Sequence, residues 1–242
     1  MVDESTPDVV VLREGTEGLS MREYADELAA RLPDHDVAHA ATPREERELV
    51  AETPVVTGIS IDEELLSSAS NLRLFCCVFS GTDHLPTDAL AERGVAVTNA
   101  GGIHAPGLAE QALGYMLTFA RGLHRAHGRM ERREWRHWQG GELQGSTVTV
   151  VGLGAIGRTL VERLSGWDVH TVGVRYTPSK GGPTDEVVGF DDDAVHDAFA
   201  RSDYVVLASP LTETTANLVD EAALATLNPD AVLVNIARGG IV

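Results

Sequence analysis

The sequence contains a single lysine, Lys180, beside 18 arginines. Its 37 acidic residues outnumber its 19 basic ones, and the formal net charge is −18 at pH 7. Because phosphate backbones are bound through lysine and arginine, this balance argues against nucleic acid as a partner. At low ionic strength the like charges of an acidic surface repel one another and destabilise the folded protein. In about 1 M salt the Debye length is about 3 Å, and this repulsion is screened. The composition is similar to that of haloarchaeal proteins and predicts a halophilic protein; the alternative is an ordinary acidic cytosolic protein.

Cysteine and long apolar runs are also scarce. The two cysteines, Cys76 and Cys77, are neighbours that form no easy disulfide and have no metal-ligand spacing, so we interpret them as buried small hydrophobic residues and expect no metal. No uncharged apolar run reaches the roughly 18 residues of a membrane span, and Met1–Ser5 lacks the basic residues that begin a signal peptide. We therefore expect a cytoplasmic protein without a membrane partner.

The segment Thr147–Gly157 is the most informative part of the sequence. A β-branched apolar run leads into Gly152, Gly154 and Gly157 at the spacing G-x-G-x-x-G, and a helical pattern follows. Gly152 suits a tight turn, Gly154 lets the backbone touch a pyrophosphate, and Gly157 lets the helix close on the strand. The helix N-terminus offers free amides and a positive dipole end to phosphates. This pattern predicts a dinucleotide site whose residues are Gly152, Leu153, Gly154, Ala155, Ile156 and Gly157.

The loop after the next strand indicates which dinucleotide is bound. In dinucleotide-binding folds with this glycine turn, an acidic residue at the end of the second strand usually binds the ribose 2′-hydroxyl of NAD. In this sequence Arg175 occupies that position. A guanidinium can bind a 2′-phosphate, and Tyr176, Thr177 and Lys180 belong to the same loop. We therefore predict that NADP(H) is preferred over NAD(H). The alternative is that Arg175 is a solvated loop residue.

Short apolar runs alternate with amphipathic segments along the whole chain, which is typical of parallel sheets. The expected strands are Val9–Leu12, Val37–Ala40, Val55–Thr57, a central buried strand Arg73–Phe79, Val95–Thr98, the run from Thr147, Val169–Val174, Tyr204–Leu207 and Ala231–Asn235. The expected helices are Ser20–Leu32 with a capping box from Ser20 to Glu23, Thr42–Glu52, Ile61–Ser68, Thr87–Arg93, Gly107–His127, Arg158–Ser165, Asp193–Ala200 and Glu221–Leu227.

The turn-rich segment from Asn99 to Pro106 separates two such blocks and predicts a hinge. We expect an α/β protein with two Rossmann- or flavodoxin-like parallel-sheet domains and a cleft between them. Residues 1–99, which have no fingerprint glycines, would form the substrate domain. Residues 100–242 would form the dinucleotide-binding domain.

Five blocks in order carry a resemblance to a known family. They are Ser80–His84, Asn99–Glu110, the glycine fingerprint, Ser209–Thr215 and Asn235–Gly239. Over essentially its whole length the chain resembles the D-isomer-specific 2-hydroxyacid dehydrogenases. That resemblance implies hydride transfer between NADP(H) and a 2-oxo acid or D-2-hydroxy acid. Two alternatives stay open: a phosphoglycerate or erythronate dehydrogenase on the same scaffold, and a nucleotide-sensing binding module without turnover.

The resemblance also implies roles for single residues. Arg238 would be the catalytic arginine, which holds the substrate carboxylate and polarises the 2-oxo group, as a forked guanidinium can. The substrate-binding residues would be Ser80, Gly81 and Thr82. The nicotinamide end would be lined by Ser209, Pro210, Ile236 and Ala237, with Thr215 supporting its loop. Without the family, Ser80 and Gly81 are a strand-end turn and Arg238 is a surface residue.

This sequence departs from the family pattern at its C-terminal end. A later Glu and a later His normally complete the active site, where the His protonates the alkoxide and the Glu orients it and raises its pKa. Neither His84 nor His104 stands at that position. We therefore expect a sequence truncated at the C-terminus, without the last strands of the cofactor sheet and the helix that returns to the first domain. In this form we expect binding without turnover.

Two tryptophans, Trp135 and Trp138, lie outside any clear element. Exposed aromatics of this kind indicate a homodimer contact, and we expect it to include the apolar helix Gly107–His127. The alternative is that the tryptophans pack internally.

Overall fold

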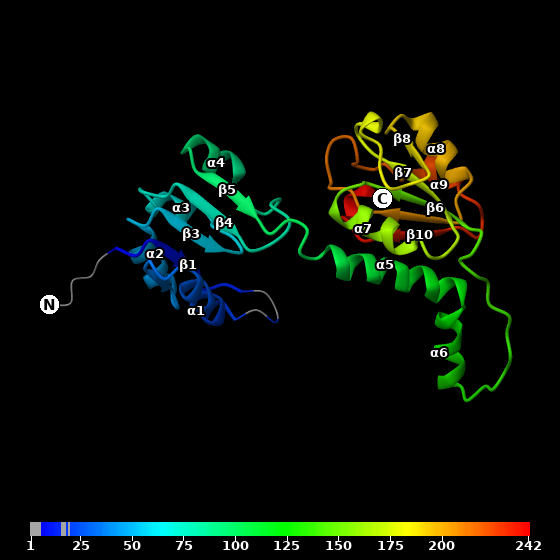
Figure 1. Cartoon of the computed structure of the whole chain (residues 1–242), viewed down its shortest axis with the longest axis horizontal. Helices are drawn as coiled ribbons and strands as arrows, with labels where there is room; N and C mark the ends of the chain where they lie inside the picture. The colour runs from blue at the N-terminus through cyan, green and yellow to red at the C-terminus, as the bar shows by residue number, and fades with distance from the viewer. Residues whose placement is uncertain (1–5, 16–17, 19) are drawn as a thin grey trace. The chain divides into compact units, whose positions relative to one another are not determined.

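The computed structural model describes residues 6–15, 18 and 20–242, and the chain forms two compact units, Met1–Ile103 and His104–Val242. Each unit contains one five-stranded parallel sheet, which confirms the predicted α/β class with two parallel-sheet domains (Figure 1). The units divide after Ile103, within the turn-rich segment. Among the described residues, no helix is both long and apolar enough to cross a bilayer.

The sheet of the first unit has the strand order β2-β1-β3-β4-β5. The strands are β1 Val9–Val11, β2 Val37–His39, β3 Val55–Gly58, β4 Leu74–Cys77 and β5 Ala96–Asn99. The helices are α1 Met21–Arg31, α2 Pro43–Val50, α3 Glu63–Ser68 and α4 Thr87–Glu92. Helix α1 packs on one face through Met21 and Ala25, and the core of the other face includes Val50, Leu66 and Leu90 of the remaining helices.

Strand β4 pairs with β3 on one side and β5 on the other, as predicted for a central strand, and its residues alternate between half-buried and buried. The capping box expected at Ser20 needs correction. The complete capping box is found at Thr42, whose hydroxyl accepts from the Glu45 amide at 3.2 Å while the Glu45 carboxylate accepts from the Thr42 amide at 3.1 Å. At Ser20 the hydroxyl accepts from the Glu23 amide at 3.3 Å. Both motifs satisfy amides that the first helical turn leaves unpaired.

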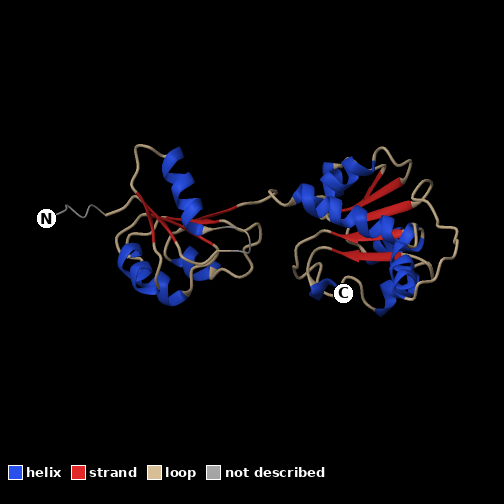
Figure 2. Cartoon of the chain, turned by 90° about the horizontal axis from the view of Figure 1, so that it is seen from below, coloured by secondary structure: helices blue, strands red, loops and turns tan. Residues whose placement is uncertain are grey.

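The sheet of the second unit has the order β10-β9-β6-β7-β8. The strands are β6 Thr147–Val151, β7 His170–Val174, β8 Glu186–Val188, β9 Tyr204–Leu207 and β10 Val232–Asn235. The helices are α5 Ala105–Ala120, α6 Leu123–Glu131, α7 Ala155–Leu164, α8 Asp192–Ala200 and α9 Glu221–Thr226, with 3₁₀ turns at Pro178–Lys180 and Gly239–Ile241. Helices cover both faces of this sheet (Figure 2).

Alternation along the strands explains why β9 is apolar throughout and why β6, Thr147–Val151, is apolar except for two threonines, of which the buried Thr149 pairs its hydroxyl with that of Ser202 at 2.7 Å. Val148 and Val150 of β6 pack with α5 and α7, whereas Val151 packs on the opposite face with α8 and α9. Successive side chains of a strand point to opposite faces, so a strand covered on both sides carries apolar residues, or polar ones whose hydrogen bonds are satisfied, at every position.

The predicted helix Gly107–His127 is two helices. Helix α5 ends at Ala120, and α6 begins at Leu123 after Gly122, which has a left-handed backbone with φ 66°. The Gly122 amide donates to the Phe119 carbonyl at 3.1 Å, which closes the last turn of α5. A glycine in this conformation ends a helix because it has no Cβ to clash. The edge strand β8, three residues long, was not predicted.

Candidate functional site

The order of the second sheet places its candidate site. From β6 the chain continues to β7 and β8 on one side, and it then returns to β9 and β10 on the other. Such a reversal leaves a crevice at the carboxyl ends of the two strands that flank it, here β6 and β9. Because all strands are parallel, the loops that begin at Gly152, Arg175, Ala208 and Ile236 lie along this one edge.

The three fingerprint glycines differ in what the fold requires of them. A Cβ at Gly152, whose φ is 98°, would lie 2.7 Å from the Ser209 amide nitrogen, and a Cβ at Gly157 would overlap the Gly152 carbonyl oxygen. These two glycines are needed for the turn and for close packing of α7 on β6. A Cβ at Gly154 would meet no atom within 4 Å. The space before Gly154 is therefore available to a ligand.

A cavity of about 550 Å³ lies at this edge of the sheet. Ten predicted cofactor residues line it: Gly152, Leu153, Gly154, Arg175, Tyr176, Thr177, Lys180, Ser209, Pro210 and Thr215. Three lining residues were missed by sequence reasoning: Phe190, Thr212 and Thr214. The two threonines lie inside the block Ser209–Thr215, which could have indicated them, whereas Phe190 carried no local signal.

The electrostatic character of this cavity is opposite to that of the whole chain. No aspartate or glutamate is among its lining residues in the described chain, whereas Arg175 and Lys180 are. Gly154 caps the N-terminus of α7 without a side chain, so the first amides of α7 are left for a ligand. These features suit a phosphate-bearing dinucleotide.

Arg175 is half-buried, and its guanidinium donates to the Gly181 carbonyl while its amide donates to the Val188 carbonyl at 3.0 Å. The side chain is thus held by its own loop, unlike a fully solvated residue. The loop is fixed further by Asp185, which accepts from the Thr171 amide and hydroxyl, both at 2.7 Å. These hydrogen bonds from Thr171 lower the pKa of Asp185.

Ser209 is buried, with 5% of its surface exposed, and its hydroxyl has no hydrogen-bond partner among the described residues. An unpaired buried hydroxyl costs about 1–3 kcal/mol. The neighbouring loop is internally satisfied, because the Thr215 hydroxyl donates to the Pro210 carbonyl at 2.6 Å and accepts from the Thr212 amide at 2.8 Å. Ser209 lines the cavity, and we expect rotation of its side chain about χ1 to bring this hydroxyl to a bound dinucleotide.

We expect Ser209→Ala to weaken NADPH binding about 5- to 10-fold, the value of roughly one hydrogen bond, without loss of thermal stability. Titration calorimetry and a melting curve measure the two quantities. Ser202→Ala is the matched control, since the Ser202 hydroxyl is also buried but donates to the Ala198 carbonyl at 2.7 Å. That control should lose stability and keep its affinity. Unchanged affinity in Ser209→Ala would assign the hydroxyl no role in binding.

Arg238 follows β10 and is exposed. Its turn is shaped by Asn235, whose amide donates to the Arg238 carbonyl at 2.9 Å and whose side-chain oxygen accepts from the Ala237 amide at 2.9 Å. Asn235, which the sequence analysis included in a family block without a role of its own, thus fixes the turn that carries Arg238. Strand β10 is two strands from β6, or about 10 Å at the usual spacing.

The other predicted residues lie outside the cavity lining. Gly157 packs against β6, and Ala155 and Ile156 lie in the first turn of α7. Ile236 and Ala237 pack against the cores on opposite faces of the sheet. Their roles at the nicotinamide end stay predictions.

In the first unit, Ser80, Gly81 and Thr82 follow β4 and are half-buried. The Ser80 carbonyl accepts from the Asn99 side chain at 2.6 Å, which fixes this loop. His84 lies 2.7 Å from the Ile59 carbonyl through its Nε2 atom. Within the described residues no group of three or more His, Cys, Asp or Glu side chains could hold a metal ion.

Residues 113–242 match the sequence model of the D-isomer specific 2-hydroxyacid dehydrogenase family, NAD binding domain. The chain belongs to this family. It is 32% identical over 212 residues to D-3-phosphoglycerate dehydrogenase of Mycobacterium bovis, with 87% of the chain and 39% of that protein covered. It is 28% identical over 243 residues to hydroxypyruvate reductase of Thermotoga maritima, with 100% of the chain and 73% of that protein covered. The chain thus spans about two fifths of the length of the first of these relatives.

Solved structures show the same fold. A D-isomer specific 2-hydroxyacid dehydrogenase family protein from Aeromonas salmonicida superposes with a TM-score of 0.81 at 23% identity, covering 98% of this chain and 75% of that one. NAD-dependent formate dehydrogenase from Staphylococcus aureus, in complex with NAD, gives a TM-score of 0.75 at 25% identity, with 97% and 74% covered. An acyclic imino acid reductase in complex with NADPH gives 0.78 at 18% identity, with 97% and 76% covered.

Proposed function

We propose that the protein is an oxidoreductase that transfers a hydride between NADP(H) and a 2-oxo acid or D-2-hydroxy acid. The observation that carries the proposal is the glycine-turn cavity, which is open at Gly154 and lined by cations without carboxylates. Membership of the dehydrogenase family supports the same reaction class. The test is NADPH oxidation with a panel of 2-oxo acids, using the protein expressed from its whole reading frame.

In this proposal the nicotinamide ring, when bound, supplies or accepts the hydride. The amides at the start of α7 and the glycine turn hold the pyrophosphate, and Ser209 donates to the dinucleotide. Arg238 binds the substrate carboxylate and polarises the 2-oxo group, which stabilises the charge that develops on its oxygen. In the reduction that oxygen also takes up one proton, which a histidine supplies in the family pattern. Ser80, Gly81 and Thr82 are proposed as further substrate-binding residues, on the family resemblance.

The same NADPH oxidation assays distinguish two other functions from the proposed one. A phosphoglycerate- or erythronate-type dehydrogenase is favoured by the similarity to D-3-phosphoglycerate dehydrogenases, and it would act on the corresponding phosphorylated acids in the panel. A nucleotide-sensing module would bind NADPH and oxidise it with none of the acids.

For the cofactor preference we expect wild-type protein to bind NADPH at least about 10-fold more tightly than NADH, because a charge-assisted hydrogen bond to a 2′-phosphate contributes about 1.5–3 kcal/mol. Arg175→Gln should remove most of this preference by weakening NADPH binding alone. Arg163→Gln is the control, because Arg163 pairs with Glu110 on the surface and does not line the cavity. Fluorescence titration with both cofactors gives the ratios. A wild-type preference for NADH would refute the assignment.

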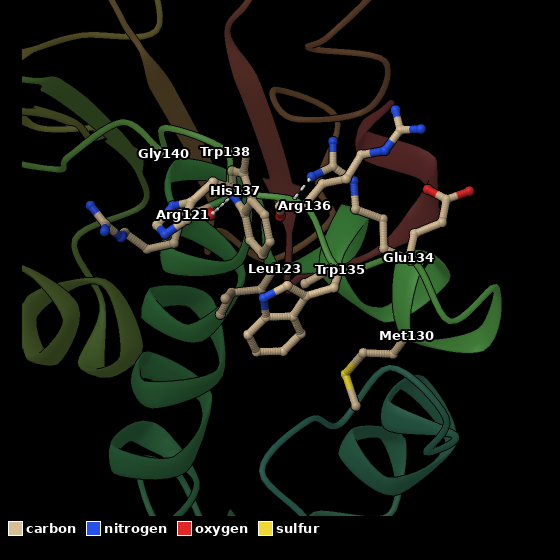
Figure 3. Close-up of a pocket in the computed structure, with 11 residues that line it drawn as sticks. Arg121, Leu123, Met130, Glu134, Trp135, Arg136, His137, Trp138 and Gly140 are labelled. Carbon is tan, nitrogen blue, oxygen red and sulfur yellow. Dashed lines mark hydrogen bonds between the residues drawn. The ribbon is translucent and has the colours of Figure 1, made fainter.

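We also propose a cytoplasmic homodimer with a surface adapted to molar salt, in keeping with the exposed side chains of Trp135 and Trp138 (Figure 3) and the net charge of −18.

A further inference from the structure

Strands β7 and β8 are joined by eleven residues, 175 to 185, which we call the crossover loop. The two strands are parallel neighbours at one edge of the second sheet (Figure 1). Such a connection usually takes about a dozen or more residues and includes an α-helix. All eleven residues are described by the structure, and their only regular element is the 3₁₀ turn Pro178–Lys180. The loop nevertheless carries both cations of the cavity, Arg175 and Lys180, so its contacts with the rest of the unit fix where these cations lie.

A glycine in β7 makes room for the crossover loop. A Cβ at Gly173 would lie 2.9 Å from the Oγ1 atom of Thr184 and 2.6 Å from the Cδ1 atom of Leu153. Side chains do not pack at such distances, because interiors are already filled to the density of organic crystals. The loop therefore passes directly over β7 at the one position of that strand that has no side chain.

Leu153 joins the glycine turn to the crossover loop. Its side chain is buried, with 6% of the residue exposed, and it also lines the cavity. A Cβ at Gly182 of the loop would lie 2.6 Å from the same Cδ1 atom that approaches Gly173. The two glycines thus form a socket for Leu153. One side chain connects the turn proposed to hold the pyrophosphate with the loop that carries the cations.

Hydrogen bonds hold both ends of the crossover loop. At its end, the Asp185 carboxylate accepts from the Thr171 amide and hydroxyl, both at 2.7 Å, and the Asp185 amide donates to the Thr171 hydroxyl at 3.0 Å. At its start, the Arg175 amide donates to the Val188 carbonyl at 3.0 Å. The loop is therefore fixed to β7 and β8 as well as to the glycine turn.

We propose that Leu153 and Asp185 are positioning residues that set the two cations at the distance from the glycine turn that NADPH requires. NADPH differs from NADH only in its 2′-phosphate, which this loop would bind, whereas the glycine turn would bind the pyrophosphate of both. Charge-assisted hydrogen bonds are short, about 2.7–2.9 Å, so a displaced loop loses them. A displaced loop should thus weaken NADPH binding and spare NADH. The inference rests on the proposed binding of NADP(H) in this cavity.

The first test releases the end of the loop. Asp185→Asn should raise the NADPH dissociation constant about 5- to 10-fold, and that of NADH by less than about 2-fold, in fluorescence titrations. Loss of a negative charge would by itself favour binding of a phosphate, so a weaker affinity reports a change of position. Thr171→Val, which removes the hydroxyl and keeps the amide, should have a smaller effect in the same direction. Thr171→Ser should behave as the wild type.

The matched control is Asp203→Asn. The Asp203 carboxylate accepts from the Thr147 amide at 2.8 Å at the start of β6, a bond of the same kind at the same edge of the sheet but outside the crossover loop. This variant should keep the affinities of both cofactors. Hydrogen exchange followed by mass spectrometry, without cofactor, should show faster exchange of residues 175–185 in Asp185→Asn and not in Asp203→Asn.

The second test fills the socket. Gly182→Val should displace the loop from Leu153 and raise the NADPH dissociation constant at least about 10-fold, the value of one charge-assisted hydrogen bond. Gly166→Val is its control, because a Cβ there meets no atom within 4 Å, and neither glycine has a left-handed backbone. Melting curves show whether each variant is folded.

NADPH binding as tight as wild type in Asp185→Asn or Gly182→Val would overturn the proposal. An equal loss of NADPH and NADH affinity, which indicates a merely structural role, would do the same. Failure of the proposed function has a different signature. A wild type that binds neither cofactor would refute it, while the exchange data would still show whether Asp185 holds the loop.

Discussion

Gly154→Val is expected to weaken NADPH binding by at least about 100-fold and to leave the second unit folded. A Cβ at Gly154 would meet no atom within 4 Å, and the backbone there, with φ −76°, lies in a region that residues with a side chain adopt. The valine would instead occupy the space in which the pyrophosphate approaches the turn. A loss of 100-fold corresponds to about 2.7 kcal/mol of binding free energy.

Gly157→Val is the matched variant. We expect its main effect to be a loss of folding stability, whereas the main effect of Gly154→Val is a loss of NADPH binding. Its Cβ would overlap the Gly152 carbonyl oxygen, and backbone atoms cannot yield as a flexible side chain can. We expect the free energy of unfolding to fall by about 3 kcal/mol or more, the upper range for overpacked sites. Urea unfolding followed by circular dichroism, beside NADPH titration, separates the two effects. If Gly154→Val bound NADPH as the wild type does, the glycine turn would not be the cofactor site.

Arg238→Ala is expected to lower kcat/KM for the best 2-oxo acid at least about 100-fold, or about 3 kcal/mol of transition-state stabilisation. The guanidinium would be lost both as carboxylate partner and as donor to the 2-oxo oxygen. Arg238→Lys should recover only part of this loss, because an ammonium keeps the charge without the planar fork. Steady-state kinetics with the protein from its whole reading frame, in which wild-type turnover is measured first, gives these values.

The control for this pair is NADPH affinity, which should stay within about 2-fold of wild type, since Arg238 does not line the cavity of the glycine turn. Asn235→Ala should lie between wild type and Arg238→Ala, because it removes both hydrogen bonds that shape the turn. Near-normal kcat/KM in Arg238→Ala would rule out the proposed catalytic role.

The sequence alone was sufficient for the parallel-sheet class and for the glycine turn. Apolar runs such as Tyr204–Leu207 are strands because their residues are β-branched or large and are covered on both faces, and this preference is local. Gly152 and Gly157 were assigned correctly because their constraints arise within one strand–turn–helix segment. The hydrogen bonds of Thr215, likewise, lie within one short loop.

Only the tertiary structure decided the features that depend on distant parts of the chain. Gly122 interrupts a continuous helical pattern, and Trp138, which packs beside it, follows the second helix. Strand β8 exists through its pairing with β7. No protein group pairs with the hydroxyl of Ser209, and none fills the space at Gly154. Which groups lie near these two positions depends on the order of β9, β6 and β7 across the sheet. The local sequence determines the propensity of a segment for helix or strand, whereas these features arise from contacts between segments far apart in the chain.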